Sequence, residues 1–151
     1  MFSTVRYFVK TSIGFLIIGI LTGLYLLILQ KVYGVFPHPE LVSAHTHVIL
    51  VGSVMMMIMG VALWFFPRAE KDDKLYKPNL ILFTYYLFTF STLTRFISQL
   101  IFAFNIYNII KWIIVFSSIF QVLSMILFFI SIWGRIRPVG SHIREAKGEK
   151  F

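Results

Sequence analysis

The chain has 151 residues, of which 58% are apolar and only 13% are charged, and it contains no cysteine. A soluble domain is about half apolar and about a quarter charged, so this composition excludes an ordinary soluble fold. The lack of cysteine excludes disulfides, iron–sulfur clusters, thiolate zinc sites and covalently attached haem. A net charge of +8 would suggest nucleic-acid binding in a soluble protein. Here the cations flank long apolar runs, so we interpret the charge as a topology signal and expect no nucleic-acid partner.

Four apolar runs predict four transmembrane helices. Each run has about 20 residues or more, which at about 1.5 Å per residue crosses a hydrocarbon core of about 30 Å. The expected helices cover residues 11–30, 44–66, 80–104 and 106–133, and a basic tail follows over residues 134–151. The turn near Asn105 is very short, so the last two helices should be neighbours. We expect residues 1–151 to form a single all-α domain, an integral membrane four-helix bundle.

The distribution of lysine and arginine predicts the orientation, because these residues are enriched in cytoplasmic segments of membrane proteins. Eleven of the 14 lie on one side of the predicted bundle: Arg6, Lys10, Arg68, Lys71, Lys74, Lys77, Arg135, Arg137, Arg144, Lys147 and Lys150. We therefore expect a multi-pass protein of the cell (inner or plasma) membrane with cytoplasmic N- and C-termini. The start of the second helix then faces outward.

All six carboxylates lie outside the apolar runs. Pumps and cation-coupled transporters usually place such groups within the membrane. The sequence also shows neither an internal repeat nor a pair of broken helices, which are typical of transporters. A transport function is therefore not expected.

Two histidines, His45 and His47, stand at the start of the second predicted helix. At about 100° per residue they lie about 200° apart and cannot serve one site on one face. The His45 face continues through Gly52 and Met56, where a glycine would leave room for a flat ring and methionine packs adaptably. We interpret His45 as the better candidate for a metal ligand and His47 as the second choice. The alternative is that both are solvated at the membrane interface.

The segment from Val42 to Gly52 (VSAHTHVILVG), together with Gly60 to Arg68 (GVALWFFPR), resembles a known membrane helix. It is similar to the second helix of the catalytic subunit of the haem–copper oxidase superfamily, above all in the nitric oxide reductase and cbb-type oxidase branch. The resemblance implies that His45 is an axial ligand of a low-spin, non-covalent haem b near the outer membrane face. It further implies a small relative of that fold, a membrane b-type cytochrome that transfers electrons.

The number of histidines limits this implication. The family's catalytic centre needs a second axial histidine, one for a high-spin haem and three for copper or iron, whereas this chain has four histidines in all. We interpret His38, between two prolines, and His142, in the basic tail, as solvated surface residues. Reduction of oxygen or nitric oxide is therefore not expected, and we expect an electron carrier rather than an enzyme.

The source of the second axial ligand stays open. It is a second His45 in a symmetric homodimer, a methionine such as Met56 or Met125, or a residue of another subunit. We favour a homodimer that shares haem at its interface, because a two-fold axis brings the same histidine from each of two copies to one haem. The small-xxx-small pair Gly19 and Gly23 serves either as the dimer seam or for packing within the chain.

Arg95 lies inside the third apolar run, where a guanidinium needs a partner. Since no run contains a carboxylate, we expect Arg95 to bind a haem propionate near the outer surface, for which its planar fork is suited. The alternative is that it snorkels to the outer headgroups. Lys111, at the start of the fourth helix, is interpreted as an interface anchor within reach of a second propionate.

Three other functions remain open beside electron transfer. One is a cofactor-free accessory or assembly subunit of a respiratory complex, in which the histidines merely lie at the interface. The second is a haem-based sensor or carrier with an open axial position, and the third is an enzyme that carries out redox chemistry at such an open haem without copper. For an electron carrier we expect a quinol or another respiratory-chain redox partner, besides the lipid bilayer.

Overall fold

The computed structural model describes residues 2–66, 78–105, 107–136 and 148. The elements in these ranges are all helical: α1 (Phe2–Lys31), α2 (Pro39–His47), the π-helix η1 (Val48–Met55), α3 (Met56–Phe65), α4 (Pro78–Phe104), α5 (Asn108–Ile132) and the short 3-10 turn η2 (Trp133–Arg135). Because α2, η1 and α3 follow one another directly, they form one span from Pro39 to Phe65. The described part of the chain thus contains four helices long and apolar enough to cross a membrane, which confirms the all-α prediction.

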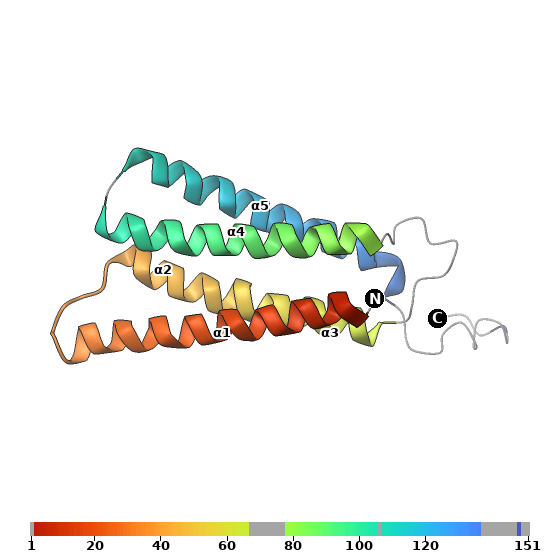
Figure 1. Cartoon of the computed structure of the whole chain (residues 1–151), viewed down its shortest axis with the longest axis horizontal. Coiled ribbons are helices and arrows are strands. Elements are labelled where there is room, and N and C mark those ends of the chain that lie inside the picture. Colours follow the sequence, from red (N-terminus) through yellow and green to blue (C-terminus); the bar gives the residue numbers. More distant parts are fainter. Residues whose placement is uncertain (1, 67–77, 106, 137–147, 149–151) are drawn as a thin grey trace.

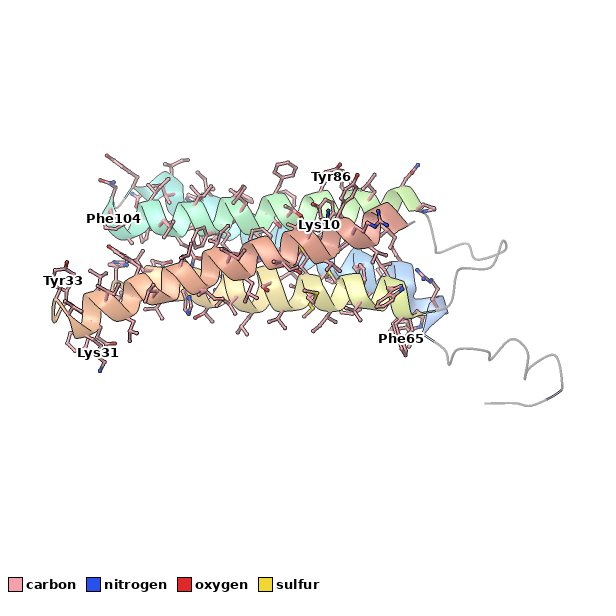
Figure 2. The ribbon with its side chains drawn as sticks, turned by 60° about the horizontal axis from the view of Figure 1, so that its bottom comes forward. Lys10, Lys31, Tyr33, Phe65, Tyr86 and Phe104 are labelled. Carbon is pink, nitrogen blue, oxygen red and sulfur yellow. The ribbon has the colours of Figure 1, made fainter. Side chains whose placement is uncertain are left out.

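The helices pack as two pairs that lie side by side (Figure 1). In one pair α1 packs along η1 and α3, and in the other α5 packs along α4. The pairs meet mainly where α2 contacts α4. The neighbouring positions of α4 and α5 confirm the prediction made from the short turn between them. In Figure 2, Lys31, Tyr33 and Phe104 lie at one end of the bundle, and Phe65 lies at the other.

Three of the four spans begin before the apolar runs from which they were predicted, whereas α5 begins at Asn108 rather than at residue 106. α1 begins at Phe2, and α2 begins at Pro39 rather than at residue 44. Pro39 occupies the first helical turn, where its missing N–H and fixed φ are favourable. The exposed side chain of His38 accepts a hydrogen bond from the backbone N–H of Glu40, at 3.2 Å. His38 is therefore a surface cap, as predicted, whereas His142 and most of the tail lie outside the described residues.

The interior of the bundle is more polar than its periphery. Large apolar side chains cover the outer surface of every long helix. Serines inside the bundle donate to carbonyl oxygens of their own helix: Ser12 to Val9, Ser91 to Phe88, Ser124 to Gln121 and Ser131 to Leu127. Such local bonds satisfy hydroxyls without water and allow helices to approach closely. This polarity fits a lipid environment.

Glycines set the close packing of α1 on the second span. A Cβ at Gly19 would collide with Ile49, and one at Gly23 would lie 2.7 Å from Cε1 of His45. On the opposing span, a Cβ at Gly60 would lie 3.0 Å from Cβ of Phe8. Of the two alternatives left open by the sequence, the Gly19 and Gly23 pair therefore serves packing within the chain.

We expect Gly19→Ala and Gly14→Ala to have different effects on stability. Alanine favours helix over glycine by about 1 kcal/mol, and a Cβ at Gly14 meets nothing within 4 Å. Gly14→Ala should therefore keep or raise the melting temperature. At Gly19 the overpacking should cost about 1–3 kcal/mol and lower it. Thermal unfolding in detergent, followed by circular dichroism, compares the two variants. Equal melting temperatures would contradict a role of Gly19 in the close packing of α1.

Candidate functional site: two histidines and a buried arginine

His45 and His47 contact different helices. His45 lies against α1, while His47 lies against α4. Ala44 and Val48, which flank the pair, are buried in the bundle between these two contacts. The two histidines therefore belong to two separate sites, as their angular separation on a helix requires.

The imidazole of His45 is oriented by the backbone of α1. Its Nδ1 lies 3.0 Å from the carbonyl oxygen of Gly19. A carbonyl oxygen only accepts, so Nδ1 carries a proton, and in the neutral imidazole the lone pair is then on Nε2. The half-buried ring packs on Gly23, where any side chain would displace it. A histidine whose Nδ1–H is bound to a backbone carbonyl has the arrangement of many metal ligands.

Both ring nitrogens of His47 are used by the protein. Nδ1 donates to the carbonyl oxygen of Ser43 at 2.8 Å, and Nε2 accepts from Nη2 of Arg95 at 2.9 Å. The imidazole is therefore neutral in this arrangement. It offers no lone pair to a metal while Arg95 is bound.

Arg95 links three helices. Its Nη2 donates to His47 on α2, and its Nη1 donates to Oε1 of Gln121 on α5 at 3.0 Å. The amide of Gln121 in turn donates to Oγ1 of Thr92 at 2.8 Å. The guanidinium thus has hydrogen-bond partners within the protein, on the His47 side of α2 rather than beside His45. The propionate expected from the sequence as a partner of Arg95 stays a prediction.

Gln99 extends the polar cluster toward the end of α2. Its Nε2 donates to Oε2 of Glu40 at 3.1 Å and to Oγ of Ser43 at 2.8 Å. Glu40 was expected outside the membrane segments, but the early start of α2 places it in the first helical turn. Its carboxylate thereby joins the polar cluster that surrounds Arg95. The predicted second helix, residues 44–66, left this carboxylate outside, whereas the observed span from Pro39 to Phe65 includes it.

Two buried polar atoms of the cluster have no hydrogen-bond partner among the described residues. They are Nε of Arg95, a donor, and Oε1 of Gln99, an acceptor. The two residues are one helical turn apart on α4, so they share a face. A water molecule or a hydroxyl group both accepts and donates hydrogen bonds. It is therefore the kind of group that pairs with a donor and an acceptor of this sort.

The space expected for a flat ring at Gly52 is filled. A Cβ at this position would lie 3.0 Å from Cγ2 of Thr92 and 3.1 Å from Cγ of Phe15. Met56, next along the same face, is fully buried in the core. A haem between His45 and Met56 therefore does not fit inside a single bundle. The candidate iron ligand in this chain is Nε2 of His45, which lies at the edge where α2 contacts α1.

Two further residues from the sequence analysis have partners elsewhere. Nζ of Lys111 lies 5.7 Å from the centroid of the Phe102 ring, a cation–π contact across the α4–α5 turn. Met125, considered as an axial ligand, packs against the core cluster.

The Arg95–His47 bond can be measured by a double-mutant cycle. Arg95→Met leaves acceptors on His47 and Gln121 without donors, so we expect a destabilisation of about 1–3 kcal/mol. Combined with His47→Phe, the loss should be smaller than the sum by about 0.5–2 kcal/mol, because both variants remove the same interhelical bond. Unfolding in mixed detergent and dodecyl sulfate micelles gives the values.

The control combines His47→Phe with Lys111→Met, which touch no common residue. These two changes should be additive. If Arg95→Met and His47→Phe were additive as well, the bond between them would not contribute to stability.

Comparison with known proteins adds no relative to this geometry. No family model matches the chain, and neither a curated protein nor a solved structure is significantly similar to it. The functional argument therefore depends on the residues described above.

Proposed function

We propose that the protein is a membrane haem b protein in which Nε2 of His45 binds the iron and single electrons pass near the outer membrane face. The observation that carries the proposal is the hydrogen bond from Nδ1 of His45 to the Gly19 carbonyl. It leaves Nε2 as the ring's only lone pair and holds the ring at the edge of the bundle. The resemblance of the surrounding sequence to a haem-binding helix supports the same assignment.

The interior packing places this haem between copies of the chain. Phe15 and Thr92 close the face at Gly52, so a macrocycle bound to His45 extends outward from the α1–α2 edge. A two-fold axis through that edge supplies a second His45, which completes two axial ligands. We therefore propose a homodimer with one haem per two chains.

The chain's own residues position and tune the iron ligand. The Gly19 carbonyl fixes the ring plane of His45 and increases the basicity of Nε2, which stabilises the oxidised iron. Gly23 allows the imidazole to lie directly on α1. The bond between His47 and Arg95 holds the same turn of α2 against α4. When bound, haem supplies the reversible one-electron chemistry.

The orientation proposed from the charges is compatible with this placement. Among the described residues, the end of the bundle that carries Phe2 has three cations, Arg6, Lys10 and Arg135. With that end in the cytoplasm, His45 lies toward the outer face. A quinol or another respiratory redox partner would then exchange electrons there.

A cofactor-free accessory subunit is a second candidate, and one observation favours it. The two Nη atoms of Arg95 donate to His47 and to Gln121, so these three side chains are hydrogen-bonded to one another. In that case the cluster serves to hold the helix pairs together, and the purified protein is colourless.

Absorption spectra of oxidised and reduced protein, expressed with sufficient haem, test the proposal. The wild type should show a low-spin haem b spectrum, and His45→Ala should lose at least about 90% of the haem because an axial ligand is removed. His47→Ala is the matched control two residues away. It should retain the haem while the protein melts at a lower temperature.

A colourless wild type would overturn the haem proposal and favour the accessory subunit. Full haem content and an unchanged low-spin spectrum in His45→Ala would exclude His45 as the ligand. A stoichiometry of one haem per chain would exclude the shared site.

A further inference from the structure

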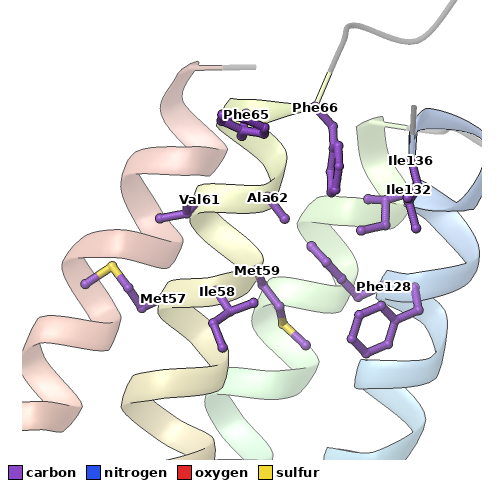
Figure 3. A pocket seen from close by; sticks show the side chains of 11 residues that line it. Met57, Ile58, Met59, Val61, Ala62, Phe65, Phe66, Phe128, Ile132 and Ile136 are labelled. Atoms are coloured by element: carbon purple, nitrogen blue, oxygen red, sulfur yellow. The ribbon is translucent and has the colours of Figure 1, made fainter. Parts of the chain in front are cut away.

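An apolar groove opens between α3 and α5 near the end of the bundle that carries Phe2 and Arg135. Its volume is about 480 Å³. The lining consists entirely of apolar side chains: Met57, Ile58, Met59, Val61, Ala62, Phe65, Phe66, Phe128, Phe129, Ile132 and Ile136. In Figure 3, Met59, Ala62 and Phe66 extend toward the helix that carries Phe128 and Ile132, whereas Met57, Val61 and Phe65 point away from it. The groove contains none of the histidines and is separate from the site proposed above.

The groove exists because each helix that borders it packs on another partner. α3 packs along α1, and α5 packs along α4. The floor of the groove is closed by Met59 and Phe128, which are buried in the core. Its rim is open, since Ile58 and Phe129 are 52% and 43% exposed. The result is a concave apolar channel whose open side faces the hydrocarbon of the membrane.

Charge at the same end of the bundle indicates the headgroup of an occupant. Arg6 and Lys10 are exposed on the first turns of α1, and Phe8 between them packs on Gly60 of α3. Arg135 donates to the carbonyl oxygens of Leu63 and Phe66, where α3 ends. Within the described ranges, every Asp, Glu, Lys or Arg at this end is a cation.

We propose that the groove is a binding site for an anionic phospholipid. One hydrocarbon chain lies between α3 and α5, and the negatively charged headgroup lies at the cationic end of the bundle. The volume falls in the range of about 300–1,000 Å³ that is typical of small-molecule sites. Basic residues beside a membrane surface favour an anionic headgroup. The apolar groove therefore complements the hydrocarbon chain of the lipid, and the cationic end of the bundle complements its headgroup.

Native mass spectrometry of the purified full chain tests the site. The protein is delipidated and exchanged with phosphatidylglycerol or with phosphatidylcholine of the same chain length. We expect one phosphatidylglycerol retained per chain, at least about tenfold more tightly than phosphatidylcholine. The rim variant Ile58→Ala/Phe129→Ala should weaken that retention about tenfold, because it removes apolar contact area.

Two control variants make the test specific. Leu50→Ala/Ile126→Ala truncates exposed apolar side chains of the same spans outside the groove and should bind as the wild type does. Arg6→Gln/Lys10→Gln should reduce the preference for phosphatidylglycerol while leaving phosphatidylcholine binding unchanged. All these side chains are exposed, so the variants should fold, and their helical circular dichroism checks this.

Three results would overturn the proposal. The first is equal retention of the two lipids by the wild type, and the second is unchanged retention in the rim variant. The third is a rim variant that converts a dimer into a monomer without loss of lipid, since a second copy of the chain would then occupy the groove. None of these measurements depends on haem, so the lipid site and the haem proposal succeed or fail separately.

Discussion

A guanidinium placed within a membrane span must find acceptors inside the protein, and the fold is organised around this requirement. Arg95 meets it with His47 on α2 and Gln121 on α5. The bond to His47 connects the two helix pairs, whereas the bond to Gln121 lies within the α4–α5 pair. With Gln99, Glu40 and Ser43, the cluster continues toward the start of α2 and fixes the turn that carries both histidines. The Arg95 cluster therefore holds one side of the turn that carries His45, and the backbone of α1 holds the other.

The histidine side chains on the two sides of α2 differ in how many of their ring nitrogens are hydrogen-bonded. On the α4 side, every nitrogen of His47 is consumed by hydrogen bonds. On the α1 side, the bond to Gly19 leaves Nε2 of His45 with a lone pair. Two histidines of one short motif thus have separate roles, the first as the proposed iron ligand and the second in positioning α2. The glycines Gly19 and Gly23 on α1 make this division possible, because only residues without a Cβ allow the His45 ring to reach the Gly19 carbonyl.

Much of the architecture could be predicted from the sequence because it follows from length and periodicity. The four spans are long apolar runs, the α4–α5 pairing follows from a short turn, and the angle between His45 and His47 follows from helical geometry. The start of α2 was missed, because Pro39 and Glu40 precede the apolar run. The space at Gly52 was also misjudged. A helical wheel describes one helix, and it does not reveal that Phe15 and Thr92 from two other helices fill that space.

The π-helix η1 separates the histidine motif from the rest of the second span. Its i→i+5 bonding accommodates an additional residue without ending the helix, and π-bulges of this kind frequently occur beside functional sites. A single-residue deletion between Val48 and Met55 would convert the segment to a regular α-helix. The relative orientation of the α2 and α3 faces would be kept. The π-helix therefore lets the histidine turn and α3 each face its own partners, although the number of residues between them does not fit a regular α-helix.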